Sequence, residues 1–429
     1  MLHASISQPP TKRTIFSRRR FQLAGALVFA AVLPFVARLL ISGGEFELSA
    51  TSNALIGNAM AVLLAFWMRL SIETYPGIRA SYVILPTAAT GHAIIVAMFL
   101  LSRLPYDRIG LTLGFLLHVV WYYAVYFSVQ RHARLRIAII PFGDVEALTT
   151  IDRVFWSTLS EPRLDEANHY DAIVADFSAD LPDEWEGFLA DAALAGKIVY
   201  QVKQLSESLT GRVELDHLSE NSFGSLLPAR GYFHLKELLD FALAVVMLPF
   251  AIPVMAVAAI AIRAESRGPV FFRQDRIGHA GKRITVLKFR TMRPFAIEDI
   301  TDHRAAAITD HKDDRITRVG SFLRRSRLDE LPQIWNILRG QMSWIGPRPE
   351  AEVLSHWYVS ELPFYRYRHV VKPGISGWAQ VNQGHVAGVD EVNRKLSYDF
   401  YYIKYFSPWL DLLILVRTIK TMLSGFGSR

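Results

Sequence analysis

The sequence predicts a membrane protein in which four N-terminal transmembrane helices precede a small Rossmann-like domain and a C-terminal α/β domain that carries a re-entrant membrane helix. Three observations indicate this fold class. Hydrophobic residues make up 51% of the 429 positions and charged residues only 20%, a composition typical of membrane proteins. Four apolar runs fill the first 130 residues, and a more polar, α/β-like sequence follows. A fifth apolar run contains two prolines.

The four N-terminal runs are each close to the roughly 20 residues that cross the hydrocarbon layer of a membrane. They cover about 21–41, 52–68, 82–101 and 109–129, which predicts a four-helix transmembrane region over 21–130. The first run is long for a signal peptide and further runs follow, so we interpret it as a membrane span. His92 and His118 lie inside spans without an acidic partner in their own run. We expect them to be hydrogen-bonded between helices.

The orientation of the spans follows from their flanking basic residues. These are Lys12, Arg13, Arg18, Arg19 and Arg20 before the first run, Arg69 and Arg79 after the second, and Arg131, Arg134 and Arg136 after the fourth. By contrast, the loop after the first run has Glu45 and Glu47 and no base. The positive-inside rule therefore predicts that segment 1–20 and everything after Arg131 are cytoplasmic. Arg103 and Arg108, in the third loop, run mildly against this orientation.

The net charge of +7 is compatible with nucleic acid, anionic lipid or an anionic substrate as partner. Much of the basic charge lies beside apolar segments, and no nucleic-acid-binding module is recognisable. We therefore expect lipid headgroups and phosphates, and no nucleic acid, as partners. The chain has no cysteine, which excludes disulfides, thiolate metal sites and a cysteine nucleophile.

Residues 136–220 resemble a small α/β domain in their pattern. Buried strands are predicted at 136–140, 171–176 and 197–200, with a helix over 184–195. Only one glycine, Gly143, follows the first strand, and the G-x-G-x-x-G fingerprint of dinucleotide sites is missing. We interpret the segment as a degenerate Rossmann-like domain with a structural or regulatory role. Segment 221–231 contains Ser, Pro and Gly and is predicted to be a linker.

The fifth apolar run, 241–262, is long enough to span a membrane. Pro249 and Pro253 each remove a backbone donor and clash with the preceding turn, so a helix here should kink. Lys236 before the run and Arg263 after it favour the same membrane face for both ends. A fifth transmembrane helix is the alternative, but it would place everything after Arg263 outside the cell.

The segment Arg324–Gln333 places two adjacent carboxylates, Asp329 and Glu330, among three arginines. A carboxylate can be a nucleophile or a metal ligand, and nearby arginines keep it ionised and bind phosphate. A solvated charged turn would have the same composition. However, Pro347-Arg348-Pro349 follows on a glycine-bounded loop, where two prolines restrict the backbone that presents the arginine. Together these features predict phosphoryl chemistry.

A basic strand is predicted before the acidic pair, over 283–290. Ile284, Val286 and Phe289 alternate weakly with Thr285, Lys288 and Arg290. A basic edge strand that discourages aggregation would have the same pattern.

Together these motifs resemble the bacterial sugar transferase family from about Lys236 to the C-terminus. The resemblance rests on Asp313–Pro349, on Lys288-Phe289-Arg290-Thr291-Met292 before it and on Lys372-Pro373-Gly374-Ile375-Ser376-Gly377-Trp378-Ala379-Gln380-Val381-Asn382 after it. The family consists of monotopic phosphoglycosyl transferases, which move a sugar-1-phosphate from a UDP-sugar to a polyprenyl phosphate. It implies a catalytic domain over 232–429, with a re-entrant helix over 236–264 that is hinged at Pro253. Ile252 stands where relatives often have Ser.

The resemblance also implies roles for the site residues. Asp329 and Glu330 would be catalytic, with Asp329 as nucleophile and Glu330 as Mg²⁺ ligand. Phosphate would be bound by Lys288, Arg290, Arg324 and Arg348, and supporting roles would fall to Arg315, Arg318, Pro347, Pro349 and Gln380. Mg²⁺ suits this set because it prefers one or two carboxylates together with phosphate oxygens and water. A covalent phosphosugar–aspartate intermediate would give ping-pong kinetics.

The expected partners are a UDP-sugar, polyprenyl (undecaprenyl) phosphate and the lipids of the bacterial inner membrane, and homo-oligomer formation stays open. An enzyme of this kind would initiate exopolysaccharide, capsule or O-antigen synthesis from the cytoplasmic face. Gln383-Gly384-His385 replaces the Gly-Arg frequent in relatives, so the sugar is not assigned. A four-span transporter or sensor with a cytoplasmic regulatory domain is the alternative for the N-terminal half.

The C-terminal segment 409–423 has apolar residues at helical spacing, with Asp411, Arg417 and Lys420 at other positions. This pattern suits a helix lying in the membrane interface. A helix that packs onto the domain core would have the same pattern, and the sequence favours neither.

Overall fold

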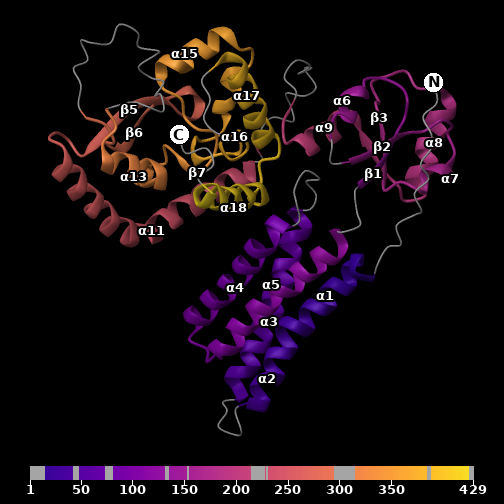
Figure 1. The fold of residues 1–429 in the computed structure, drawn as a ribbon, viewed down its shortest axis with the longest axis horizontal. Helices are drawn as coiled ribbons and strands as arrows, with labels where there is room; N and C mark the ends of the chain where they lie inside the picture. The colour runs from indigo at the N-terminus through magenta and orange to yellow at the C-terminus, as the bar shows by residue number, and fades with distance from the viewer. Residues whose placement is uncertain are drawn as a thin grey trace. The chain divides into compact units, whose positions relative to one another are not determined.

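The structure is a computed structural model that describes residues 15–41, 48–72, 81–130, 135–151, 154–213, 228, 230–293, 315–383 and 388–424. The chain forms two compact units, Met1–Thr210 and Gly211–Arg429. The first unit contains long apolar helices and a parallel sheet, and the second is an α/β unit with one long apolar helix (Figure 1).

The N-terminal region is helical, as predicted. A short 3-10 turn (Ile15–Ser17) is followed by α1 (Arg19–Leu27), a π-helical stretch (Val28–Val32) and α2 (Leu33–Ile41), and then by α3 (Leu48–Ile72), α4 (Ser81–Ser102) and α5 (Arg108–Gln130). Within the described residues, five helices are long and apolar enough to cross a membrane: four in this region and one in the second unit. Small residues allow close packing: a Cβ on Gly91 of α4 would lie 2.7 Å from the carbonyl oxygen of Ala61 in α3.

His92 and His118 lie buried side by side, with 5.4 Å between their ring centroids. The expected hydrogen bond between helices is wrong for His92. Its Nδ1 instead pairs with the carbonyl oxygen of Ala88 in the same helix, at 2.9 Å, because an imidazole can reach the carbonyl one turn back. The guanidinium of Arg69 lies 3.6 Å from the ring centre of Tyr122, so the bundle interior contains polar groups from three helices.

Residues 135–201 form a four-stranded parallel sheet in the order β2-β1-β3-β4. The strands are β1 (Leu135–Ile139), β2 (Val154–Thr158), β3 (Ala172–Ala175) and β4 (Ile198–Gln201), and the helices around them are α6 (Glu146–Thr149), α7 (Leu164–Ala167), α8 (Asp183–Leu194) and α9 (Val202–Thr210). The three predicted strands and the predicted helix are therefore confirmed. Edge strand β2 is additional, and the sequence did not indicate it because only Val154 of its five residues is buried.

The strand order of this sheet reverses between β1 and β3, where open α/β sheets commonly bind ligands. Here the chain itself fills the crevice. The carboxylate of Asp176 accepts hydrogen bonds from the backbone N–H groups of Asp144 and Ser178, both at 3.0 Å. A Cβ on Gly143, which has φ +79°, would lie 2.4 Å from Asp176 Oδ2. Backbone donors that could hold a phosphate are thus already engaged by a protein carboxylate.

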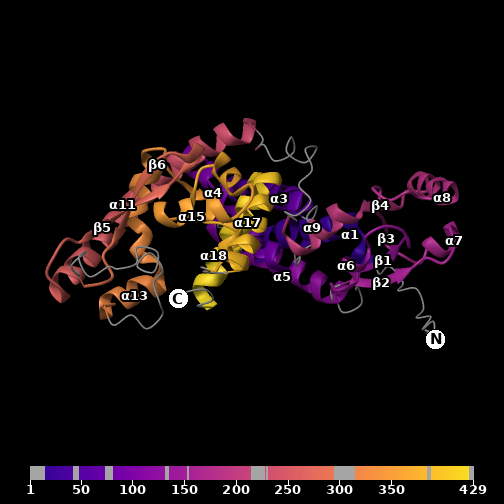
Figure 2. The same cartoon turned by 90° about the horizontal axis from the view of Figure 1, so that it is seen from above.

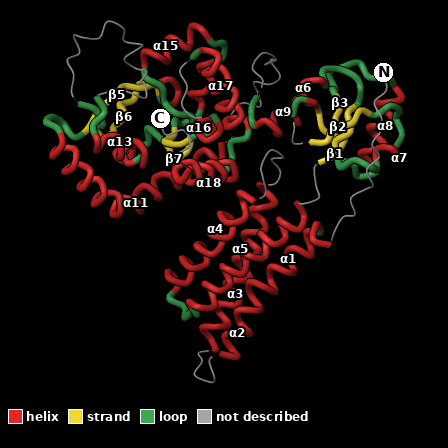
Figure 3. The backbone as a smooth tube through the Cα atoms, in the orientation of Figure 1, coloured by secondary structure: helices red, strands yellow, loops and turns green. Residues whose placement is uncertain are grey.

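The second unit begins with α11 (Arg230–Glu265), a single 36-residue helix that contains both Pro249 and Pro253. It is bent rather than interrupted (Figure 3). Arg230 already belongs to the helix, although it falls in the predicted linker 221–231; most of that linker lies outside the described residues. The bend agrees with the kink expected from the prolines.

One face of α11 packs against its own unit along the whole helix. Ala244 and Ala251 belong to a core cluster with the neighbouring hairpin, and Ala258 and Ile262 belong to the next cluster. The three alanines recur every seven residues, so they share one face. Large apolar side chains lie exposed on the rest of the helix: Leu238, Leu239, Phe241, Val245, Val246, Phe250, Ile252, Val257 and Ile260. An apolar surface of this length marks a membrane protein.

Both ends of α11 are tied to the same unit. Near its start, the ammonium of Lys236 and the hydroxyl of Tyr232 each lie 2.6 Å from Asp411 Oδ2. At its end, the carboxylate of Glu265 accepts hydrogen bonds from the backbone N–H groups of Arg318 and Val319 at 2.8 and 2.9 Å.

The remaining elements form a compact α/β arrangement. An antiparallel hairpin of β5 (Phe271–Ile277) and β6 (Arg283–Phe289), joined by a 3-10 turn (His279–Gly281), lies beside α11 in both views (Figures 1 and 2). Then follow α13 (Arg318–Ser326), the 3-10 helix η6 (Leu328–Gln333), α14 (Ile334–Leu338), β7 (Ser343–Ile345), α15 (Glu352–Glu361), η7 (Tyr365–Val370), β8 (Gly374–Ser376), α16 (Trp378–Asn382), α17 (Val389–Lys404) and α18 (Pro408–Ser424). Strands β7 and β8 are parallel. The predicted basic strand is β6, and the predicted C-terminal helix is α18.

Helix α18 combines features of both interpretations given to its sequence. Leu410, Leu413 and Ile414 are fully buried, so the helix packs onto the core. Leu415, Ile419 and Met422 are 48%, 52% and 47% exposed and form an apolar stripe at helical spacing.

Candidate active site

Asp329 and Glu330 lie in the 3-10 helix η6. The preceding helix α13 ends at Arg327, which adopts the left-handed conformation with φ 60° and ψ 15°. In a 3-10 helix, with about three residues per turn, neighbouring side chains diverge by about 120°. The two acids can therefore address different atoms of one ligand.

Asn336 docks this segment onto strand β6. Its side-chain oxygen accepts a hydrogen bond from the N–H of Leu287 at 3.1 Å, and its side-chain nitrogen donates to the carbonyl of Thr285 at 2.8 Å. The amide thus replaces a neighbouring strand at the edge of β6. This contact brings Lys288, the next residue along the strand, to the acidic pair.

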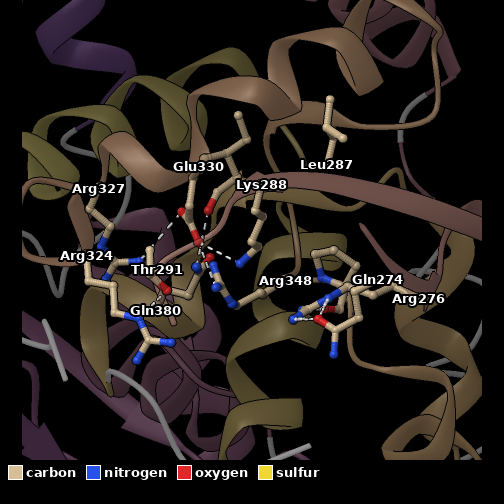
Figure 4. A network of polar contacts seen from close by, with 12 residues as sticks. Gln274, Arg276, Leu287, Lys288, Thr291, Arg324, Arg327, Glu330, Arg348 and Gln380 are labelled. Carbon is tan, nitrogen blue, oxygen red and sulfur yellow. Dashed lines mark hydrogen bonds and ion pairs between the residues drawn. The ribbon is translucent and has the colours of Figure 1, made fainter. Parts of the chain in front are cut away.

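Glu330 is the centre of the cluster (Figure 4). Its Oε1 lies 2.7 Å from Arg348 Nη2 and 3.2 Å from Lys288 Nζ, and its Oε2 lies 3.8 Å from Arg327 Nη1. Burial alone would raise the pKa of Glu330, but the three cations outweigh it and hold that pKa well below its usual range. Glu330 is therefore a buried anion whose charge is compensated by the protein.

The pKa values of two neighbouring groups, Lys288 and Asp329, shift toward their neutral forms. Burial lowers the pKa of Lys288 to about 8, and the charges of Arg348 and Arg276 act in the same direction. Burial raises the pKa of Asp329, and the negative charge of Glu330 adds to the shift. Two adjacent carboxyl groups whose pKa values are pushed apart are typical of a catalytic site.

The loop that carries Arg348 is pinned on both sides through its backbone. The carbonyl of Pro347 accepts a hydrogen bond from the N–H of Gly374 at 3.0 Å, and the carbonyl of Pro349 accepts one from the guanidinium of Arg276. The backbones approach so closely that a Cβ on Gly374 would lie 2.1 Å from the nitrogen of Gly346. The predicted supporting prolines thus present carbonyls to fixed donors.

Arg368 holds the same loop from the domain interior. Its guanidinium donates to the carbonyl of Arg348 at 2.9 Å, to the hydroxyl of Tyr365 at 2.9 Å and to the carboxylate of Asp399 at 2.8 Å. The side chains of Arg368 and Asp399 are only 3% and 2% exposed.

The structure brings Lys288, Asp329, Glu330 and Arg348 together. Arg324 donates from Nε to the hydroxyl of Thr291 at 2.9 Å.

Arg290 contacts the turn after α11, where it donates to the carbonyls of Ser266 and Arg267 at 2.9 and 3.1 Å. The carbonyl of Arg315 accepts a hydrogen bond from the N–H of Arg293 at 2.9 Å, and Arg318 lies at the first turn of α13.

Two further predicted residues differ in their distance from the acids. Gln380 lines a cavity that Arg327 and Glu330 also line. Pro253 is exposed on α11. Their functional roles, like those of the other site residues, stay predictions.

Three arginines of this region were not among the predicted site residues. Arg327 belongs to the acidic motif, but its left-handed backbone cannot be inferred from sequence because non-glycine residues seldom adopt it. Arg276 and Arg368 lie in segments without a recognisable pattern and reach the Arg348 loop only through the fold.

Carboxylate ligands for a metal ion are sparse. Within the described part of the chain, no group of three or more His, Asp or Glu side chains is placed to hold a metal ion. Glu330 and Asp329 nevertheless fit Mg²⁺, which often takes only one or two protein carboxylates together with phosphate oxygens and water. The Oε2 atom of Glu330 has the more distant cation, Arg327 at 3.8 Å.

A bent helix with an exposed apolar face, attached to an α/β domain with a buried acid–cation cluster, defines a membrane-associated enzyme. The model of a family described as bacterial sugar transferase matches residues 231–425, which include every residue of this cluster. A relative from Aeromonas hydrophila, UDP-N-acetylgalactosamine-undecaprenyl-phosphate N-acetylgalactosaminephosphotransferase, is 42% identical over 419 residues, or 97% of each chain. The chain belongs to the bacterial sugar transferase family, and it is a transferase.

Two other relatives match less than half of the chain. The UDP-glucose:undecaprenyl-phosphate glucose-1-phosphate transferase of Xanthomonas campestris is 45% identical over 190 residues, 44% of this chain and 38% of the relative. The protein of the same name from Escherichia coli is 40% identical over 187 residues, 43% of this chain and 39% of the relative. Family membership accounts for the ordered motifs from Lys288 to Asn382, which a transporter or sensor leaves unexplained.

Proposed function

We propose that this protein transfers a sugar-1-phosphate from a UDP-sugar to undecaprenyl phosphate and releases UMP. The observation that carries the proposal is the buried contact of Glu330 with Lys288 and Arg348, next to Asp329. The names of the relatives support the substrate classes. Because the Aeromonas relative aligns along nearly the whole chain, UDP-N-acetylgalactosamine is the first donor to test.

In the first step, a carboxylate oxygen of Asp329 attacks the phosphorus that bears the sugar. The bond from this phosphorus to the oxygen that bridges the two phosphates breaks, and UMP leaves with the electron pair. The enzyme then holds the phosphosugar as an acyl phosphate on Asp329. Arg348 and Lys288 stabilise the charge that develops on the phosphate oxygens, and Arg324 lies on the adjoining helix to bind the remaining phosphate.

In the second step, a phosphate oxygen of undecaprenyl phosphate attacks the same phosphorus. The bond between the phosphorus and Asp329 breaks, which restores the carboxylate and yields the undecaprenyl diphosphate sugar. No proton is gained or lost overall. Glu330 is not consumed in either step, in keeping with its low pKa.

We assign a Mg²⁺ site to Glu330. When bound, the ion would neutralise the diphosphate and stabilise the departing UMP. The protein cations around Glu330 contribute to the same charge neutralisation. They already compensate one buried negative charge, that of Glu330.

The proposed topology has four spans followed by a re-entrant helix, at the cytoplasmic face of the inner membrane. Contacts at both ends of α11 support re-entry, because Lys236 and Glu265 bind the same compact unit. If α11 crossed the bilayer, the polar groups that pack beside it would have to enter hydrocarbon, which is costly. The exposed apolar residues of α11 would instead contact lipid in one leaflet.

The parallel sheet is proposed to be a Rossmann-like module without a nucleotide, with a structural or regulatory role. In the cell, the product would start exopolysaccharide, capsule or O-antigen repeat units. A relative from Rhizobium leguminosarum named exopolysaccharide production protein PSS supports this assignment; it is 36% identical over 195 residues, 44% of this chain and 96% of the relative.

The test is a single-turnover assay with purified protein, Mg²⁺ and UDP-N-acetylgalactosamine, repeated with other UDP-sugars. Without acceptor we expect a burst of about one UMP per enzyme, and a phosphosugar adduct on Asp329 by mass spectrometry. Asp329→Asn should abolish the burst. UMP release that requires both substrates, with intersecting initial-rate lines and no adduct, would replace double displacement by direct transfer.

A further inference from the structure

A small cavity adjoins the acidic pair among η6, β8, α16 and α18. Its volume is about 160 Å³, and the residues that line it include Arg327, Glu330, Leu331, Trp344, Val381 and Met422. An apolar protein cavity of about 150 Å³ is large enough to bind benzene. The space therefore suits an apolar group of five or six carbons.

The hydroxyl groups of the cavity wall have partners within the protein. Thr418 Oγ1 donates to the carbonyl of Ile414 at 2.7 Å, and Ser376 Oγ lies 2.6 Å from Thr418 Oγ1. Thr421 Oγ1 donates to the carbonyl of Arg417 at 2.7 Å. A sugar ring or a base bound here would leave its own polar groups poorly paired, which is unfavourable in a buried site.

The amide of Gln380 is engaged on one side only. Its Nε2 donates to the carbonyl of Ile375 at 3.2 Å, and its buried Oε1 has no hydrogen-bond partner among the described residues. Most other side chains that line the cavity are aliphatic or aromatic. Apart from Gln380 Oε1 and the charged pair Glu330 and Arg327, the wall offers no uncommitted polar group, so it favours a hydrocarbon occupant.

The lining of the cavity combines charged and apolar side chains. Glu330 and Arg327 are charged, and the side chain of Arg327 is 31% exposed. Met422 also lines the cavity, and it is the last member of the exposed stripe that contains Leu415 and Ile419. An anionic head beside Arg327 and an apolar tail that leaves past Met422 match this combination.

We propose that this cavity binds the isoprene unit next to the phosphate of the acceptor lipid. The side chains that contact this unit are Val381, Leu331 and Trp344. The inference rests on the proposed function, and it adds where the acceptor binds. An isoprene unit has five carbons, which agrees with the volume. The lipid phosphate would lie at Arg327, beside the acids, while the rest of the chain follows the stripe of α18 into the membrane.

The decisive variant is Val381→Phe, which fills the cavity with a ring. We expect the KM for undecaprenyl phosphate to rise at least tenfold, while the acceptor-independent UMP burst keeps its amplitude. The KM for farnesyl phosphate should rise by the same factor, because only the first isoprene unit enters the cavity. The matched control is Val353→Phe on α15, whose side chain is exposed and outside the cavity; it should leave both values unchanged.

Val381→Ala is a milder variant that controls for misfolding of Val381→Phe. Misfolding would appear as loss of the UMP burst. Val381→Ala removes two methyl groups from the wall and should raise both acceptor KM values about three- to tenfold. Unchanged acceptor KM values in this variant would overturn the proposal. So would a raised KM for the UDP-sugar with unaltered acceptor values, which would assign the cavity to the donor. If wild-type protein gives no UMP with any UDP-sugar, the proposed function itself fails.

Discussion

The guanidinium of Arg368 donates a hydrogen bond of 2.9 Å to the backbone carbonyl of Arg348, whose own guanidinium lies 2.7 Å from Glu330. The position of Arg348 therefore depends on a buried residue twenty positions further along the chain, and not only on its two flanking prolines. Because Arg368 is also paired with Asp399, the loop at the acids is fixed to helix α17 in the domain interior.

Replacing Arg368 by Met should destabilise the protein strongly. The change leaves the buried carboxylate of Asp399 without its cation, which typically costs about 3–5 kcal/mol. Thermal or chemical unfolding in detergent measures the effect. Arg366→Met is the matched control because Arg366 is exposed, and equal stability of the two variants would show that the ion pair is unimportant.

Arg348→Lys should lower the rate of the UMP burst by about 10²–10³. Lysine keeps the charge but cannot supply the planar fork that binds two oxygens at once. The burst rate under single-turnover conditions measures the change. Arg325→Lys, at an exposed position of α13, should behave as wild type. Near-full activity of Arg348→Lys would show that Arg348 does not need to bind two oxygens at once.

The donor half-reaction should lose rate on the alkaline side. Burial lowers the pKa of Lys288 to about 8, so its positive charge is present below that pH and is lost as the pH rises through it. A pH profile of the burst rate should fall above about pH 8 for this reason. Lys288→Arg keeps the charge and should move the alkaline limb to higher pH; an unmoved limb would assign it to another group.

The two ends of α11 should be accessible from the same side of the membrane. Because the chain has no cysteine, His234→Cys and Arg267→Cys provide single labelling sites without further changes. Both should react with an impermeant maleimide from the cytoplasmic side only, whereas Glu45→Cys, in the loop after the first span, should react from outside. External labelling of Arg267→Cys would contradict re-entry.

Pro253→Ala tests the hinge in the same assay. Alanine restores the backbone donor and removes the clash with the preceding turn, so it should straighten the helix and shift part of the Arg267→Cys population to external labelling. An unchanged labelling pattern would show that the tertiary contacts of α11 suffice for its topology.

Sequence patterns were sufficient where one short segment carries the information. The long apolar helices follow from hydrophobicity over about 20 residues, and α8 and β1 follow from local periodicity. The acidic pair, Lys288 and Arg348 were found through motifs and lie together in the structure. Here the residues that matter are close in sequence, or their types are distinctive.

Other features depend on contacts between distant segments and could not be inferred. Strand β2 becomes a strand because it pairs with β1, although its own residues are mostly polar or exposed. Asn336 resembles any surface amide in sequence, yet its side chain replaces a strand beside β6. For the same reason Arg290, although predicted to bind phosphate with Lys288, donates hydrogen bonds to the turn after α11.

The left-handed backbone of Arg327 sets a limit on how far this site could be optimised for stability. A side chain in that conformation costs about 1–2 kcal/mol relative to glycine, and glycine is the usual residue at such a helix end. Arg327→Gly should therefore raise the melting temperature but remove the cation that faces Glu330 Oε2. Selection for stability favours glycine at this position, and selection for activity favours arginine, as expected at a functional site.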